Sequence, residues 1–118
     1  MNINDVIEDG NRYYKLEDGK SVKVVFENNF EKKVSDYDGK KTIKYECPCT
    51  ISEGLDGEAG VVLAKTWSGS SKFYQDLMDM AINNQAIFEE SIFRISRNGQ
   101  GKDTRYSSTF EGIIDASL

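Results

Sequence analysis

The sequence predicts a mainly β domain with one α-helix between its third and fourth strands. Over most of the chain, apolar and polar residues alternate with a period of two, in runs rich in β-branched residues. Segment 69–85 instead repeats its apolar residues at helical spacing. The chain has 118 residues, of which 38% are hydrophobic and 30% charged, as is typical of one folded domain. We therefore expect a single domain over 1–118, with the polar residues 1–11 flexible.

Five segments carry the strand pattern. In the first, Val22, Val24 and Phe26 alternate with Ser21, Lys23 and Val25 after a turn at 17–19. Turn-rich or glycine-rich polar stretches at 27–41 and 52–60 separate the first three strands. In chain order, the predicted strands are 13–26, 41–51, 61–67, 91–99 and 104–112.

The second predicted strand contains Cys47, Pro48 and Cys49. Proline has no amide hydrogen, so Pro48 is expected near the end of the strand or on a sheet edge. The two cysteines point to the same face of a strand but rarely meet disulfide geometry at this spacing. We interpret them as ordinary strand or core residues, with a metal shared between subunits or redox chemistry as the alternatives.

The predicted helix has one continuous apolar stripe. Phe73, Leu77 and Ala81 form one row, and Tyr74, Met78 and Ile82 form the adjoining row. Ser70 or Ser71 is a suitable N-cap, and Asn83–Asn84 is a suitable end. Five strands with a helix in this place follow the order of the OB-fold, a small, partly open Greek-key barrel. Small α+β sandwiches can share this order and stay open as the alternative.

Composition argues against several classes of function. The chain has no histidine, which is the commonest general base and a frequent metal ligand, and its carboxylates form no distinct pair. Two cysteines alone do not make a tetrahedral zinc site. We expect no enzymatic activity, no cofactor and no metal. No apolar run approaches the roughly 20 residues that cross a bilayer, and the N-terminus lacks a signal pattern. A cytoplasmic protein is expected, in the host cytoplasm if the chain is viral.

The segment 93–106 gathers positive charge in an acidic chain. It contains four cations and one acid, a balance of +3, whereas the whole chain has a net charge of −5. The remainder therefore carries −8. Glycines 99 and 101 allow backbone amides to approach a phosphate closely. In an OB barrel this segment would form the fourth strand, the following loop and the start of the fifth strand, next to the oligonucleotide-binding face.

Single-stranded nucleic acid needs cations for its phosphates and flat side chains for its bases. The cations expected to contact phosphates are Lys65, Arg94, Arg97, Lys102 and Arg105, with Lys23 and Lys44 extending the groove. The rings expected to stack on bases are Trp67, Tyr106 and Phe93, with Tyr45 and Tyr13 in reserve. For Trp67 and Phe93, a place in the core is the open alternative. The cations can also be an ordinary solvated edge.

Residues 13–112 resemble a group of small OB-fold single-stranded DNA-binding proteins of phages and other mobile elements. In that group a strand ending in tryptophan precedes a helix, and the chain closes with an arginine, a Gly-x-Gly turn, a threonine and a tyrosine. The corresponding residues here are Trp67, Arg97, Gly99, Gly101, Thr104 and Tyr106. The resemblance implies a non-catalytic protein that coats exposed strands during replication or recombination, with little sequence preference. The sequence ends in "EGIIDASL", which departs from the long acidic tail that recruits partners in many such proteins.

Two functions follow as hypotheses. The first is binding of single-stranded DNA, with RNA left open and with replication or recombination proteins as further partners. The second is a protein-interaction module or small virion component on an OB-like scaffold, with the acidic loops at 52–60 and 27–38 as its contact surfaces.

Overall fold

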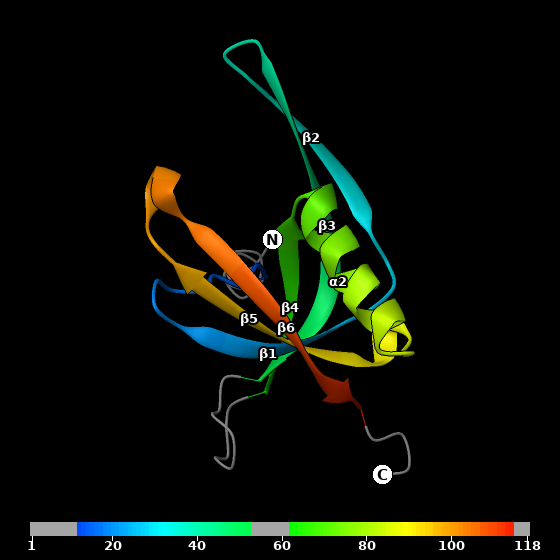
Figure 1. The fold of residues 1–118 in the computed structure, drawn as a ribbon. Coiled ribbons are helices and arrows are strands. Elements are labelled where there is room, and N and C mark those ends of the chain that lie inside the picture. The colour runs from blue at the N-terminus through cyan, green and yellow to red at the C-terminus, as the bar shows by residue number, and fades with distance from the viewer. Residues whose placement is uncertain (1–11, 53–61, 115–118) are drawn as a thin grey trace, which may run out of the picture.

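The computed structural model describes residues 12–52 and 62–114, and its strands form one antiparallel sheet (Figure 1). In chain order the strands are β1 (Ser21–Phe26), β2 (Glu31–Tyr37), β3 (Lys40–Ser52), β4 (Val62–Gly69), β5 (Ser91–Asn98) and β6 (Arg105–Ile113). The helix α2 (Ser71–Asn83) lies between β4 and β5, and the short 3-10 helices are η1 (Phe88–Glu90) and η2 (Gly101–Asp103). The predicted mainly β class is confirmed. Residues 1–11 and nearly all of the acidic loop 52–60 lie outside the described residues.

The prediction of five strands is wrong, because the described sheet has six. The additional strand is β2, in a stretch that the sequence indicated as polar turn. It pairs with the first half of β3 around the turn at Asp38 and Gly39, which both have positive φ. The resulting hairpin of β2 and the first half of β3 extends away from the rest of the fold (Figure 1). Its polar residues gave a weak strand signal because most of its side chains are exposed.

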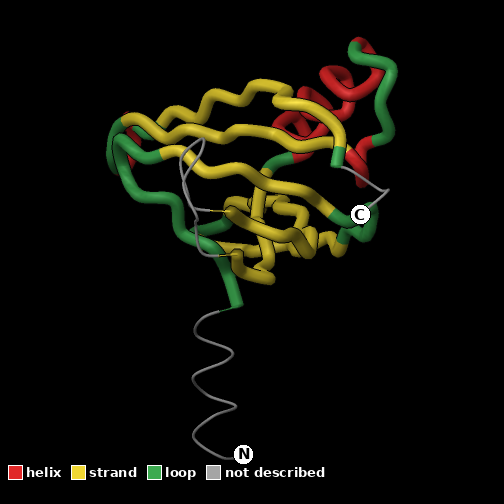
Figure 2. The backbone as a smooth tube through the Cα atoms, turned by 90° about the horizontal axis from the view of Figure 1, so that it is seen from below, coloured by secondary structure: helices red, strands yellow, loops and turns green. Residues whose placement is uncertain are grey.

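The strands follow the order β2-β3-β1-β5-β6, and β4 pairs with the other edge of β3. Figure 2 shows them curving around a common interior, with the helix to one side. The described strands do not close into a barrel, because β4 and β6 are not paired with each other. Instead, residues 12–20, here called the N-terminal strap, connect β4 with β5. The Tyr14 amide donates to the Thr66 carbonyl oxygen at 3.0 Å, and the Gly19 amide donates to the Arg97 carbonyl oxygen at 2.8 Å.

Pro48 lies within β3 rather than near its end, contrary to the sequence expectation. On one edge of β3, pairing with β2 ends at Glu46 and pairing with β1 begins at Cys49. The Pro48 carbonyl oxygen accepts from the Glu27 amide at 2.9 Å on this same edge. Since the nitrogen and oxygen of a strand residue point to the same edge, the missing amide hydrogen of Pro48 falls where β3 changes partner.

The core is an aromatic cluster centred on Phe26, which is 1% exposed. Its ring centroid lies 5.7–6.4 Å from those of the five rings of Trp67, Phe73, Tyr74, Phe88 and Phe93. β1, β4, β5, α2 and η1 all contribute to this cluster. Rings at these separations gain about 0.5–1.5 kcal/mol per pair beyond the burial of their area.

The helix agrees with its sequence pattern. Ser70 is the N-cap, and its hydroxyl accepts from the Phe73 amide at 3.2 Å. The inner side of the predicted stripe is buried at Tyr74, Leu77 and Ala81, whereas Ile82 at its margin is 69% exposed. Within the described ranges, no helix has the length and apolar character needed to span a membrane.

Cys47 and Cys49 are buried, unbridged core residues, as the sequence predicted. The Cys47 thiol donates to the Glu27 carbonyl oxygen at 2.7 Å. Burial raises the pKa of the Cys47 thiol from 9.0 to about 11 and that of the Cys49 thiol from 9.0 to about 12. Both thiols are therefore protonated at neutral pH.

These pKa shifts predict a loss of stability in alkali. Below about pH 9 the thiols are protonated in both the folded and the unfolded chain, so their contribution is fully present. Above this pH the unfolded chain ionises first, and the free energy of unfolding falls as pH rises toward 11 for Cys47 and 12 for Cys49. Urea unfolding at about pH 8 and about pH 10.5 measures the loss. The variant with both Cys47→Ala and Cys49→Ala should lose less between the two pH values, and an equal loss would contradict the prediction.

Candidate functional site

The structure divides the predicted cationic segment between two faces of the sheet. Arg97 is paired with Tyr106 across β5 and β6, on the inner face that also carries Phe93. Arg94 and Arg105 lie on the outer face, because side chains alternate along each strand. The segment therefore does not form one continuous positive wall.

Two of the four cations in this segment hold the fold together. The Arg94 guanidinium forms an ion pair with Glu111 of β6. Arg97 Nη1 donates to the Leu16 carbonyl oxygen of the N-terminal strap at 2.7 Å. Arg97, one of the predicted phosphate contacts, thus also attaches the N-terminal strap to β5.

The remaining two cations are exposed at the β5–β6 connection. Lys102 lies in η2, and Arg105 begins β6, where its Nη1 donates to the neighbouring Thr104 carbonyl oxygen at 3.0 Å. The Gly99 amide does not face an open phosphate site, since it donates to Asp18 Oδ1 at 2.7 Å. Asp18 thereby connects this turn to the N-terminal strap.

Two of the predicted stacking rings are core residues. Trp67 is 6% exposed and stacks on Phe73 with parallel rings 5.8 Å apart, and Phe93 is 0% exposed. Neither ring has a free face for a base, so their predicted binding role is corrected to a structural one. The physical reason is that the inner face of the sheet buries them against Phe26 and the helix.

Tyr106 is 51% exposed, as a stacking ring requires, but its surroundings are acidic. It opens on a pocket between β6 and α2 that is also lined by Asp76 and Asp79. Two carboxylates beside the ring repel a phosphate backbone. Tyr13, one of the two reserve rings, is 41% exposed, lies under the Arg12 guanidinium and donates to Glu46 at 2.7 Å.

The other predicted lysines are spread over the sheet. Lys23 is directly opposite Arg94 on the outer face, and Lys65 is opposite Cys49 on the inner side of β4. Lys44 and Tyr45 are neighbours on β3, but they point to opposite faces. Of all the predicted site residues, these last two lie next to a pocket and a second group of cations that the sequence reasoning missed.

That second group is the β2–β3 hairpin, here defined as residues 31–46. It carries five lysines against four carboxylates. The lysines are Lys32, Lys33, Lys40, Lys41 and Lys44, and the acids are Glu31, Asp36, Asp38 and Glu46. One lysine, Lys33, is paired with Glu31 at 2.9 Å. The signal in the sequence was a pair of lysines on each side of the turn "SDYDG".

The face of the hairpin that carries Tyr45 combines cations with exposed apolar groups. Lys32 is directly opposite Tyr45, and Val34 is directly opposite Ile43. Val34 is 57% and Ile43 46% exposed, and as cross-strand partners they form a small apolar patch on the hairpin. This face leads to the foot of the hairpin, where β3 approaches the helix.

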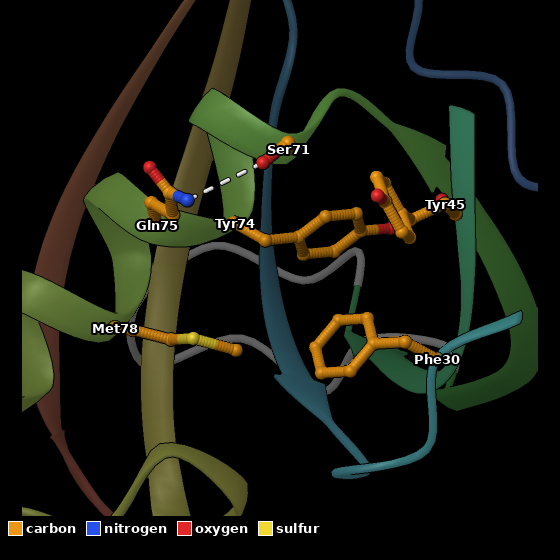
Figure 3. Close-up of a pocket in the computed structure, with 6 residues that line it drawn as sticks. All are labelled: Phe30, Tyr45, Ser71, Tyr74, Gln75 and Met78. Atoms are coloured by element: carbon orange, nitrogen blue, oxygen red, sulfur yellow. Dashed lines mark hydrogen bonds between the residues drawn. The ribbon is translucent and has the colours of Figure 1, made fainter. Parts of the chain in front are cut away.

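At this point lies a pocket of about 310 Å³, here called the aromatic pocket (Figure 3). Its volume is at the lower end of the roughly 300–1,000 Å³ typical of ligand sites. Its lining residues are Phe30, Tyr45, Ser71, Tyr74, Gln75 and Met78. Among the residues that the structure describes, no carboxylate lines it, in contrast to the pocket beside Tyr106.

The walls of the aromatic pocket are fixed by bonds to the sheet. The buried Tyr74 ring packs edge-on against Phe30 at 4.9 Å, and its hydroxyl donates to the Trp67 carbonyl oxygen at 2.8 Å. Burial raises the pKa of Tyr74, so this hydroxyl stays protonated. Phe30, Tyr45 and Met78 are half-buried and offer apolar surface to the opening. The sequence pattern indicated Tyr74 and Met78 only as part of the helix stripe and placed Phe30 in a loop.

Comparison of the chain with protein-family models, with curated proteins and with solved structures found no match.

The contact between Arg97 and the strap predicts a structural phenotype. Arg97→Ala should lower the free energy of unfolding by about 1–3 kcal/mol, because it removes a charge-assisted hydrogen bond to Leu16. Arg105→Ala is the matched control: Arg105 is exposed and bonds only to its neighbour's carbonyl, so it should change stability by less than about 0.5 kcal/mol. Urea denaturation of both variants measures this, and equal stability would show that the strap does not depend on Arg97.

The β5–β6 turn requires glycine at one position more than at the other. At Gly99, φ is +94° and an added Cβ would lie 2.1 Å from the Asp103 carbonyl oxygen, whereas at Gly101, φ is +55° with open space around it. We expect Gly101→Ala to cost about 1 kcal/mol and Gly99→Ala clearly more, because the latter must displace backbone. Thermal unfolding compares the two variants, and a larger loss for Gly101→Ala would contradict this geometry.

Proposed function

We propose that this protein binds single-stranded DNA without catalysis, and that the strand follows the β2–β3 hairpin to the aromatic pocket. It would coat exposed strands in replication or recombination with little sequence preference. The observation that carries the proposal is the juxtaposition of Lys32 with Tyr45 at the mouth of an uncharged aromatic pocket. Cations for phosphates beside apolar rings for bases are the two components that single-strand binding uses.

We also propose that the fold is an opened OB barrel. Three features support this proposal. β1 pairs with β3 on one side and with β5 on the other, the helix lies between β4 and β5 in the chain, and the hairpin elongates the connection from β1 to β3. In this interpretation the N-terminal strap takes the place of direct pairing between the strands equivalent to β4 and β6. OB domains bind oligonucleotides with the loop between their first and second strands and the loop between their fourth and fifth strands. The hairpin would belong to the first of these loops.

A protein-interaction role is the second candidate, and one specific observation favours it. Val34 and Ile43 are exposed on a projecting hairpin, and an exposed apolar patch is typical of contact surfaces. Of the acidic loops first considered for that role, 52–60 lies almost entirely outside the described residues, and much of 27–38 is β2. The contact surface in this case would be the hairpin.

The salt dependence of binding tests the proposed function. Each phosphate contact contributes about −0.7 to the log–log slope of affinity against salt for single strands. A triple variant that removes hairpin charge should therefore reduce the slope by about 2. Its substitutions are Lys32→Gln, Lys41→Gln and Lys44→Gln.

The matched control removes the same charge from exposed lysines outside the hairpin. Its substitutions are Lys15→Gln, Lys20→Gln and Lys72→Gln. Fluorescence anisotropy of labelled oligo-dT at about 50 and 200 mM salt measures both slopes, with duplex DNA as a competitor. Equal slopes for the two triple variants, or equal affinity for duplex, would reject the proposed mode of binding. Oligo-U in parallel distinguishes DNA from RNA.

A further inference from the structure

We infer that the aromatic pocket receives one unpaired nucleobase, and that it is the position where the protein distinguishes a single strand from a duplex. This inference rests on the proposed function and specifies where and how the strand is held. The pocket's lining favours a flat, neutral ring, because Phe30, Tyr45 and Met78 present apolar surface and no carboxylate contributes. Figure 3 shows Phe30 and Met78 pointing toward one another across the opening.

The rim of the pocket supplies polar groups for the edge of a base. Gln75 Nε2 donates to Ser71 Oγ at 3.3 Å, on the helix side of the pocket (Figure 3). The Gln75 carboxamide oxygen and the Ser71 hydroxyl hydrogen can therefore turn toward a bound base. One acceptor and one donor at a flexible rim match the edge of any base, which fits weak sequence preference.

The cation beside the pocket can bind the phosphate of a nucleotide whose base occupies the pocket. Lys32 shares the hairpin face with Tyr45 as its direct cross-strand partner, so their Cβ atoms are about 4.5–5.5 Å apart. A base held at Tyr45 would therefore carry its phosphate toward the Lys32 ammonium. This order of apolar ring, polar rim and cation favours a nucleic acid over an apolar peptide as the occupant.

Duplex DNA cannot make the same contact. A paired base has its edge occupied by its partner and its faces covered by neighbouring pairs, and it must be unstacked before it can enter a pocket. Binding at the aromatic pocket thus selects strands whose bases are already free. The lysines alone would attract both forms, since phosphate attraction is independent of sequence and of pairing.

The experiment compares Tyr45→Ala with Tyr106→Ala, the same substitution at an exposed tyrosine beside carboxylates. Two ligands of equal length are used: oligo-dT, and a strand of abasic sites that retains every phosphate. Tyr45→Ala should weaken oligo-dT binding by about 5- to 150-fold, which corresponds to one stacked base, and leave the abasic strand unaffected. Tyr106→Ala should leave both unaffected.

A second measurement identifies the contact directly. Oligo-dT containing 5-iodouracil, irradiated in complex with the unaltered protein, should crosslink to Tyr45 or Phe30, as mass spectrometry of the digested complex can identify. The emission of the buried Trp67 reports on folding, so a Tyr45→Ala variant with native emission has kept its core.

The outcomes separate this inference from the proposed function. If oligo-dT binds but Tyr45→Ala has no effect and crosslinks form elsewhere, the base pocket is wrong and single-strand binding stands. If oligo-dT does not bind at all, the proposed function fails and the inference with it. If Tyr45→Ala instead changes the sedimentation of the protein alone, the pocket is a protein contact and the inference is overturned.

Discussion

The packing of five aromatic rings around Phe26 is the constraint on which the rest of the structure depends. Phe26 is 1% exposed and contacts rings from four other elements, so strands and helix are joined at one point. Aromatic side chains bury large areas and dominate the energetics of small cores. Buried aliphatic residues such as Ile51, Leu77 and Ile95 complete the same core. The rings that remain for binding are therefore those at the margin of the cluster, and Phe30 and Tyr45 are at that margin.

The open sheet gives the N-terminal strap its importance. β4 and β6 do not pair with each other, and residues 12–20 connect β4 with β5 instead, through Tyr14 on the β4 side and Arg97 on the β5 side. The stacking of Tyr14 on Trp67 at 6.0 Å attaches the strap to the core. Cations that the sequence suggested for phosphates are used here to satisfy backbone carbonyl groups, which are costly to bury without a partner.

The sequence was informative where local physics decides the structure. Alternation placed β4, β5 and β6, whereas only the second half of the predicted strand 13–26 is β1. The helical stripe, with Ser70 or Ser71 as N-cap, placed α2 almost to the residue. Prediction from the sequence failed where the structure depends on how strands and helix pack together. Which face Arg94 and Arg97 point to follows from the register of β5 with β6, and a cluster of cations in the sequence alternates between the faces of a strand. The burial of Trp67 likewise follows from the position of α2, which no local pattern contains.

The acidic net charge of the chain does not oppose a phosphate-binding hairpin. Electrostatic interactions between exposed charges fade within about 8–10 Å at ordinary salt. The hairpin of β2 and β3 extends away from the body, so a ligand along it would be influenced mainly by the five lysines and four carboxylates of that hairpin. The surplus of acids lies in the remainder of the chain, where it opposes adsorption of phosphate chains to other surfaces. Under the proposed function, a projecting lysine-rich hairpin on an acidic body would localise phosphate binding in a way that an evenly charged surface would not.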